Sequence, residues 1–308
     1  MKTITLGKSS LPSSRLAYGC WRIAETEDAG RTTGRAAILA AIEAGYTLFD
    51  HADIYGKSRA EAAFGAVLRE TPALRQQMLI ATKCGIRFAG EPTPDAPFRY
   101  DFSAEHIIRA CEGSLRRLAV ETIDLYQLHR PDWLMDPHEV VAAFEQLRRQ
   151  GKVREFGVSN FQPSQVALLQ KACPFPLVVN QVEVSLAHLD CFQDGTLDQC
   201  QAEQITPLAW SPLAGGKLAE GARRLLPWQE NYRVDAIVTE LDAQAQSFGV
   251  ARGTLALAWL LKHPAGIVPI VGSTQPEKIR AATQADQLHL SREQWYRLLE
   301  AARGERLP

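Results

Sequence analysis

The chain has 308 residues, of which 46% are hydrophobic and 22% are charged. This globular composition excludes intrinsic disorder for the bulk of the chain, and the length fits one large α/β domain more readily than two separate domains. With 34 basic and 35 acidic residues, the chain lacks the basic excess of a nucleic-acid-binding protein.

Short apolar segments rich in β-forming residues recur along the chain. Most are apolar on both faces, which is typical of a parallel sheet covered by helices on its outer side. The predicted strands contain residues 16–18, 46–49, 78–82, 123–128, 156–158, 177–179, 206–210 and 267–271.

Amphipathic stretches at helical spacing lie between these strands. Two of them have clear start signals, because Ser103 is a good N-cap and Asp136 is an N-cap followed by proline at the first helical position. The longest stretch is broken near Gly249. The predicted helices contain residues 35–44, 104–118, 137–150, 163–172, 195–204, 235–261 and 276–285.

This alternation gives about eight β-then-α units, the number found in a (β/α)8 TIM barrel, whose typical length of ~250 residues leaves room for additions. We expect residues 1–15 to form an N-terminal capping hairpin and residues 291–303 to form an extra C-terminal helix. The whole chain, 1–308, would be a single barrel domain. A doubly wound sheet is the alternative, disfavoured because no G-x-G-x-x-G motif follows the first predicted strand.

Polar side chains that could take part in catalysis follow three consecutive predicted strands. Asp50 and Tyr55 come after the second strand, Lys83 ends the third, and His129 follows the fourth. The carboxyl ends of barrel strands meet at one mouth, where the active sites of such folds lie. We therefore expect these four side chains to converge.

The chemistry of these four groups is mutually reinforcing. A tyrosine hydroxyl has an ordinary pKa near ~10, and a neighbouring ammonium such as that of Lys83 favours the phenolate and lowers this pKa. Asp50 would hold the ammonium in place, and His129 would orient a carbonyl oxygen. Each residue alone has an ordinary structural reading, but together at matching strand ends they suit protonation of a carbonyl oxygen while a hydride arrives at carbon.

A metal-dependent barrel hydrolase is a rival interpretation of the same strand ends. Asp50, His51, Asp53 and His129 could be its ligands, and the metal would activate water. Lys83 in the same mouth would repel a divalent cation, and the later strands carry no rich His/Asp cluster, so we disfavour this reading and expect no metal site.

Several motifs occur in the order found in aldo-keto reductases. Residues 49–56 resemble the family signature around its catalytic Asp and Tyr, and the likeness continues to the C-terminal part of the chain. Residues 18–22 and 129–132 most resemble the bacterial YdhF-type oxidoreductases of this family. The other matching motifs are residues 81–83, 124–129, 151–161, 180–181, 210–213 and 272–274.

The resemblance implies an NADPH-dependent carbonyl reductase on a (β/α)8 barrel. Tyr55 would be the general acid, Asp50 and Lys83 would tune it, and His129 would orient the substrate. Carried over by position, a second set of residues would bind the cofactor, from its carboxamide to its adenosine 2′-phosphate: Ser159, Asn160, Gln181, Trp210, Ser211, Pro212, Leu213, Lys217, Gly272, Ser273, Thr274 and Lys278.

This chain departs from the family pattern at the expected cofactor site. Trp210 stands where many members have Tyr, which keeps an aromatic face for the nicotinamide. Lys278 stands where many have Arg, which gives a point charge instead of a bidentate fork. Ala281 and Ala282 replace polar residues that often contact adenine. We therefore expect the protein to prefer NADPH to NADH, with fewer polar contacts to the adenosine end of the cofactor than many family members make.

The expected partner is a small-molecule carbonyl substrate, bound between Trp21, Ile54, Trp133 and the loop formed by residues 87–102. No apolar run approaches the ~20 residues of a membrane span, and we expect a cytoplasmic monomer or weak homo-oligomer with no nucleic-acid or membrane partner. A non-enzymatic alternative is an NADPH-sensing auxiliary subunit, as some relatives of the family are.

Overall fold

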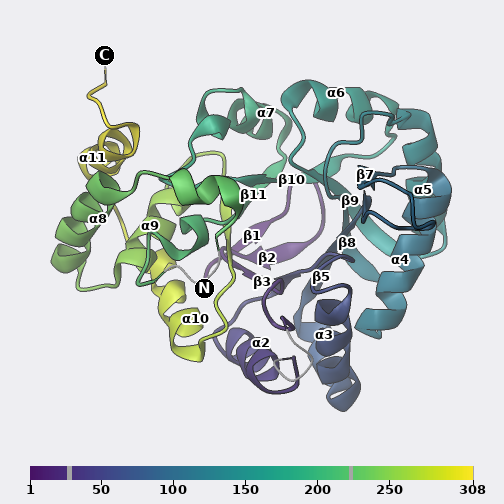
Figure 1. Cartoon of the computed structure of the whole chain (residues 1–308). Coiled ribbons are helices and arrows are strands. Elements are labelled where there is room, and N and C mark those ends of the chain that lie inside the picture. Colours follow the sequence, from purple (N-terminus) through teal and green to yellow (C-terminus); the bar gives the residue numbers. More distant parts are fainter. Residues whose placement is uncertain (26–29, 222–224, 308) are drawn as a thin grey trace.

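A closed barrel of eight parallel strands forms the centre of the computed structural model, which describes residues 1–25, 30–221 and 225–307 (Figure 1). Neighbouring strands follow chain order around the ring, and β12 pairs with β3 to close it. The predicted barrel is confirmed. Its strands are β3 (Ala17–Gly19), β4 (Leu48–Asp50), β5 (Leu79–Cys84), β8 (Ile123–Leu128), β9 (Val153–Ser159), β10 (Leu177–Glu183), β11 (Thr206–Trp210) and β12 (Val268–Val271).

Helices surround the barrel, and most begin and end within a few residues of the predicted bounds. Ser103 and Asp136 cap α4 and α5 through hydrogen bonds accepted from His106 N and His138 N. Gly249, at φ 65°, ends α8. The helices are α2 (Arg35–Glu43), α3 (Arg59–Glu70), α4 (Ala104–Leu118), α5 (Pro137–Arg149), α6 (Pro163–Ala172), α7 (Thr196–Glu203), α8 (Asp235–Phe248), α9 (Arg252–Leu261), α10 (Pro276–Ala282) and α11 (Arg292–Arg303).

Helix α3 was absent from the sequence-based prediction. Ser58, the residue before it, makes no side-chain cap bond, and Gly65 interrupts the helical pattern. The glycine has a tertiary reason, since a Cβ built on Gly65 would lie 2.0 Å from the carbonyl oxygen of Arg117 in α4. The close approach of these two helices therefore explains a residue that weakens the local helix signal.

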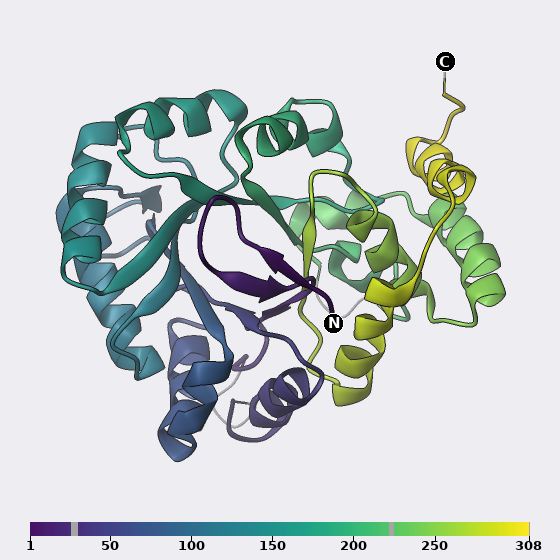
Figure 2. The ribbon, with the colours of Figure 1, turned by 180° about the vertical axis from the view of Figure 1, so that it is seen from behind.

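The predicted N-terminal hairpin consists of β1 (Thr3–Thr5) and β2 (Pro12–Ser14), which pair antiparallel. It lies across the end of the barrel opposite the carboxyl ends of the strands (Figure 2). Its Leu6 and Leu11 are fully buried in one apolar cluster with strand residues such as Leu48 and Leu208. The hairpin thus covers the bottom of the barrel core.

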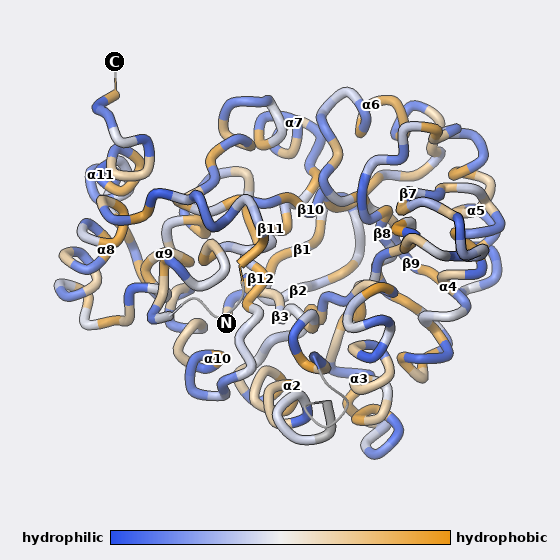
Figure 3. The backbone as a smooth tube through the Cα atoms, in the orientation of Figure 1, coloured by the Kyte–Doolittle hydropathy of each residue, from blue (hydrophilic) through white to orange (hydrophobic). Residues whose placement is uncertain are grey.

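Apolar residues concentrate in the strands and on the barrel-facing sides of the helices, while the outer helix faces are hydrophilic (Figure 3). At one edge of the molecule α8 and α11 lie side by side in both views (Figures 1 and 2). The predicted extra helix α11 packs through Trp295, whose ring stacks on Trp259 at 4.9 Å between centroids. In the described part of the chain, no helix is long and apolar enough to cross a bilayer.

The predicted loop after the third strand contains a short two-stranded ribbon. Strand β6 (Ile86–Arg87) pairs with β7 (Arg99–Tyr100), and Arg87 forms an ion pair with Asp101 at 3.1 Å. Phe102, at the end of this loop, is buried. The ribbon stands beside the carboxyl ends of β5 and β8 (Figure 1).

Candidate active site

A buried lysine at the carboxyl end of β5 organises the centre of the site. Lys83 and Asp50 are 0% and 3% exposed, and Lys83 Nζ lies 2.9 and 2.8 Å from the two carboxylate oxygens of Asp50. The same ammonium donates to His51 O at 2.7 Å and to the hydroxyl of Tyr55 at 3.2 Å. Parallel register places these residues together, because Asp50 is level with Ala81 on the neighbouring strand.

The charges of this centre act on the pKa of Tyr55 in opposing directions. Burial raises the pKa of the Tyr55 hydroxyl, and the Lys83 ammonium offsets part of that rise, but the net pKa stays above its ordinary value. The expected lowering by Lys83 is therefore present but outweighed by burial. Lys83 itself is protonated, since Asp50 and Tyr55 outweigh the effect of burial and raise its pKa. Tyr55 thus carries its proton at neutral pH and can donate it.

His129 follows β8 and faces the same centre. Its ring makes an edge contact with the Tyr55 ring at 6.0 Å between centroids. Burial, Lys83 and Arg130 together hold its pKa well below the ordinary value, so the imidazole is neutral. A neutral imidazole has one N–H donor. With the Tyr55 hydroxyl, it makes a pair of donors suited to a carbonyl oxygen.

A cavity of about 600 Å³ opens from this centre and runs along the carboxyl ends of the strands to α10. Asp50, Tyr55 and His129 line one end, while Lys83 lies behind Tyr55 and reaches the cavity through it. Lys278 in α10 lines the other end, and its ammonium donates to Glu220 O at 3.1 Å. The four predicted catalytic residues are therefore brought together at one end of a long cleft.

Most residues predicted to bind a cofactor line this cavity. A hydrogen-bonded chain links several of them: Trp210 Nε1 donates to Asn160 Oδ1, and Asn160 Nδ2 donates to Ser159 Oγ. Ser159 Oγ donates to Gln181 O at 2.8 Å, and Gln181 Nε2 donates to Asp50 Oδ1 at 2.8 Å, which connects the chain to the catalytic centre. The predicted residues that line the cavity are Ser159, Asn160, Gln181, Trp210, Ser211, Pro212, Leu213, Gly272, Ser273, Thr274 and Lys278.

Two predicted site residues lie outside the cavity. Lys217 follows a tight turn in which Ala214, Gly215 and Gly216 all have positive φ, and its ammonium is directed to the carbonyls of Glu230 and Tyr232. The turn therefore carries it away from the cleft.

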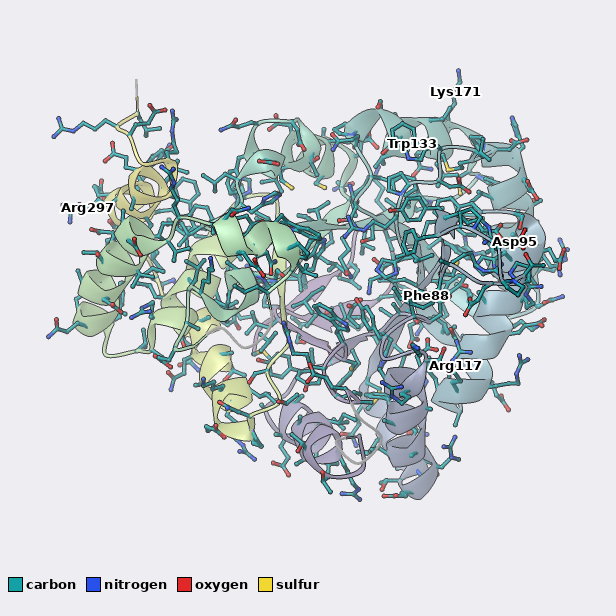
Figure 4. All side chains as sticks on the ribbon, in the orientation of Figure 1. Phe88, Asp95, Arg117, Trp133, Lys171 and Arg297 are labelled. Carbon is teal, nitrogen blue, oxygen red and sulfur yellow. The ribbon has the colours of Figure 1, made fainter. Side chains whose placement is uncertain are left out.

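Trp133 is 93% exposed. It lies on the outer side of the loop after β8, away from the centre of the barrel (Figure 4). Trp21 and Ile54, the other two residues predicted to contact the substrate, both line the cavity.

Several cavity residues were missed in the sequence. Arg130 directly follows His129, so its position after the strand was a usable signal. Arg22 follows Trp21 and lies beside Gly272, where a Cβ would come 3.2 Å from Arg22 Nη1. Phe88 lies in the loop of residues 87–102 that was predicted to bound the substrate, whereas no local pattern placed Trp228 at the cleft.

Trp228 is held in the cavity wall by a buried carboxylate. Glu183, at the end of β10, is 6% exposed. Its oxygens accept hydrogen bonds from Trp228 Nε1 at 3.0 Å, Gln229 Nε2 at 2.7 Å and the Tyr232 hydroxyl at 3.1 Å. These hydrogen bonds hold residues 228–232 against the end of β10.

The side chains proposed for a metal site do not form one. His51 is fully buried against Phe64, at 4.6 Å between ring centroids, and burial lowers its pKa to about 3. The Asp50 carboxylate is occupied by Lys83. Within residues 1–25, 30–221 and 225–307, no group of three or more His, Cys, Asp or Glu side chains could hold a metal ion.

Comparisons with known proteins agree with this geometry. The family model described as "Aldo/keto reductase family" matches residues 15–303. A protein of Novosphingobium aromaticivorans named 6-dehydroglucose reductase is 44% identical over 98% of this chain and 96% of its own length. The Escherichia coli oxidoreductase YdhF is 40% identical over the full length of both chains.

Solved structures show the same similarity. The aldo-keto reductase AKR11C1 of Bacillus halodurans, described in its holo form, superposes with a TM-score of 0.81 at 27% identity, covering 100% of this chain and 98% of that one. The likeness therefore extends over the barrel and both of its additions.

Proposed function

Because this chain belongs to the aldo/keto reductase family of oxidoreductases, we propose that it reduces aldehydes or ketones to alcohols with NADPH. Carbonyl reduction is the general reaction of the family. The observation that carries the proposal is the contact between the buried, charged Lys83 and the protonated Tyr55 at the end of a long cleft.

Tyr55 is the proton donor in this proposal. When bound, the cofactor would supply the hydride from C4 of its nicotinamide to the carbonyl carbon. As negative charge develops on the carbonyl oxygen, the Tyr55 hydroxyl gives up its proton, and the Lys83 ammonium at 3.2 Å stabilises the phenolate that remains. Asp50 keeps Lys83 in position. His129 donates a second hydrogen bond and orients the same oxygen.

The described residues fit a phosphorylated dinucleotide. The cleft joins the catalytic end to Lys278 in one space of about 600 Å³. Gly272, which also lines this cavity, has no side chain beside the Arg22 guanidinium, a surrounding suited to a phosphate group. We assign the diphosphate to this region, with Arg22 as the cation in place of Lys217. Lys278 would then face the 2′-phosphate that distinguishes NADPH from NADH.

The substrate end of the cleft is lined by Trp21, Ile54 and Phe88 next to the polar donors. Two donors beside this apolar surface can hold the carbonyl oxygen of an aldehyde or a ketone. Two relatives named 6-dehydroglucose reductase, at 44% and 39% identity, make an aldehyde of a sugar a candidate for this chain.

The proposal is tested in two steps with the purified protein. Titration with NADPH and with NADH, followed by the fluorescence of the protein's tryptophans and of the cofactor, should show tighter binding of NADPH. A panel of aldehydes and ketones should then oxidise bound NADPH, followed by its absorbance. Tight NADPH binding without oxidation by any carbonyl would contradict the reductase and support an NADPH sensor. Activity that needs no nicotinamide and is lost with EDTA would support a hydrolase.

A further inference from the structure

Arg130 is a half-buried cation beside the catalytic residues, and its guanidinium contacts an aromatic ring. Its guanidinium lies over the Trp210 ring, with Cζ at 5.6 Å from the centroid, and it lines the same cavity as Tyr55 and His129. Among the described residues, no hydrogen bond or ion pair engages this guanidinium. A guanidinium carries five N–H donors in a rigid plane, so Arg130 can donate hydrogen bonds to a molecule bound in the cavity.

A second cavity, of about 410 Å³, adjoins the first behind Arg130. Arg130, Asn160, Trp210 and Trp228 line both cavities and so form the boundary between them. A substrate tail that extends from Tyr55 past Arg130 would enter the second cavity.

The charges around the second cavity select the kind of tail that fits. Glu183, Asp190 and Asp194 line it, and Arg130 is its one Lys or Arg among the described lining residues. Asp190 is mostly exposed, and one oxygen of Asp194 accepts from Thr196 N at 2.8 Å. A carboxylate tail would meet Arg130 but also this acidic surface, whereas hydroxyl groups can accept from the guanidinium and donate to the carboxylates.

We propose that Arg130 is a substrate-specificity residue that receives the hydroxyl groups of a neutral, polyhydroxylated aldehyde, whose tail enters the second cavity. This deepens the proposed function and rests on it for the reacting end of the substrate. The Trp228 ring at the boundary supplies apolar surface for the carbon–hydrogen faces of such a tail. Arg130 also helps to keep His129 neutral, but it selects among substrates through its hydrogen bonds to their tails.

The test compares Arg130→Met and Arg130→Lys with the wild-type protein on three aldehydes of equal carbon count. D-threose has a neutral hydroxylated tail, butanal an apolar tail and succinic semialdehyde a carboxylate tail. Loss of charge-assisted hydrogen bonds should lower kcat/KM for D-threose by about tenfold or more in Arg130→Met, mainly through KM. Butanal should change by less than about threefold, since that tail makes no such bonds. Arg130→Lys should retain part of the D-threose activity.

Arg149→Met is the matched control, because Arg149 is exposed at the end of α5 and lines neither cavity. It should leave all three values unchanged. Equal losses for the three aldehydes in Arg130→Met would overturn the proposal and make Arg130 a general support of His129. A loss confined to succinic semialdehyde would overturn it in favour of an anionic tail.

A binding measurement keeps this test separate from the proposed reaction. In saturation-transfer NMR, the hexitol sorbitol should receive magnetisation from the wild-type protein and from Arg149→Met, and much less from Arg130→Met. If no aldehyde is turned over by the wild-type protein, the reductase proposal fails, while a sorbitol signal that depends on Arg130 still supports the hydroxyl site. A sorbitol signal equal in all three proteins overturns the site.

Discussion

The two ends of the cleft hold their lysines in different ways. Lys83 is fully buried, and its ammonium has partners in Asp50, His51 and Tyr55. Lys278 is half-buried, and among the described residues its ammonium makes one hydrogen bond, to the carbonyl oxygen of Glu220. At the end that holds Lys83, which we call the closed end, the protein's own groups satisfy the charge. The end that holds Lys278 is the open end. At the open end the protein leaves the charge available for a ligand.

This difference in burial determines how strongly the loss of each lysine should affect stability and ligand binding. A buried charge that loses its partner is costly, because little solvent replaces the lost interaction. A half-exposed charge is screened by water and salt, so that its removal changes binding of a ligand more than it changes folding. Removal of the buried Lys83 charge should therefore affect folding and turnover together, whereas removal of the Lys278 charge should affect cofactor choice alone.

Lys83→Met is expected to have the largest effect. It leaves the Asp50 carboxylate buried without its cation, which costs about 3–5 kcal/mol for such pairs, and Tyr55 loses the charge that stabilises its phenolate. We expect a lower melting temperature by calorimetry and no detectable NADPH oxidation with any aldehyde.

A second variant separates these two losses. In Lys83→Met with Asp50→Asn the unpaired charge is gone, so much of the stability should return while turnover stays absent. Full stability in the single variant would show that Asp50 and Lys83 are not a coupled buried pair.

Tyr55→Phe should be nearly silent for folding and severe for turnover. It removes one hydroxyl that accepts from Lys83 but keeps the ring in the cavity wall. Loss of a general acid lowers rates by about 10²–10⁴-fold, while the NADPH dissociation constant measured by fluorescence should stay within about threefold. A variant that retains the wild-type rate would exclude Tyr55 as the proton donor.

Local sequence signals were sufficient for the barrel and for its catalytic end. Asp50, Lys83 and His129 end or follow strands, so the parallel register of β4, β5 and β8 determines that they meet. Helix α3 escaped prediction because Gly65 is explained by its contact with α4, which lies about fifty residues away in the chain and has no local signature.

The positions of site residues in loops were less predictable from the sequence. Trp133 and Lys217 have the right residue types close to strand ends, yet the loop backbone directs one to solvent and the other to the carbonyls of Glu230 and Tyr232. Trp228 enters the cavity wall through its bond to Glu183, a contact between distant segments. The balance of burial and charge at Tyr55 also needs coordinates, because residue types give the direction of each effect but not which one prevails.

Asp53→Asn tests burial behind the closed end through pH. Burial and the neighbouring Glu61 raise the pKa of Asp53 to about 8. The folded protein therefore keeps a proton that the unfolded chain releases near its ordinary pKa of ~4, so ionisation of Asp53 costs stability as pH rises between these values. The variant has no such penalty. Its melting temperature minus that of the wild type should increase from pH 5 to pH 8, by about 4 °C or more.

Asp101→Asn is the control with the opposite sign. Burial disfavours the charged form of Asp101, but hydrogen bonds from Ser103 together with the charges of His106 and Arg87 outweigh it and lower the pKa of Asp101. Stability from this carboxylate is present above its unfolded pKa and lost as pH falls, so its removal should cost stability at neutral pH. A pH-independent difference for Asp53→Asn would mean that Asp53 ionises normally in the folded protein.

Lys278→Ala should have the smallest effect, confined to the open end. Loss of one charge-assisted contact to a phosphate should raise the NADPH dissociation constant by about tenfold and leave that for NADH within about twofold. Lys262→Ala, at an exposed position just after α9, is the matched control. Fluorescence titrations at low and high salt give both constants, and the NADPH effect should shrink with salt because this site is screened. Equal weakening of both cofactors would remove Lys278 from the 2′-phosphate site, and a large drop in melting temperature would show that the two ends of the cleft do not differ as their burial indicates.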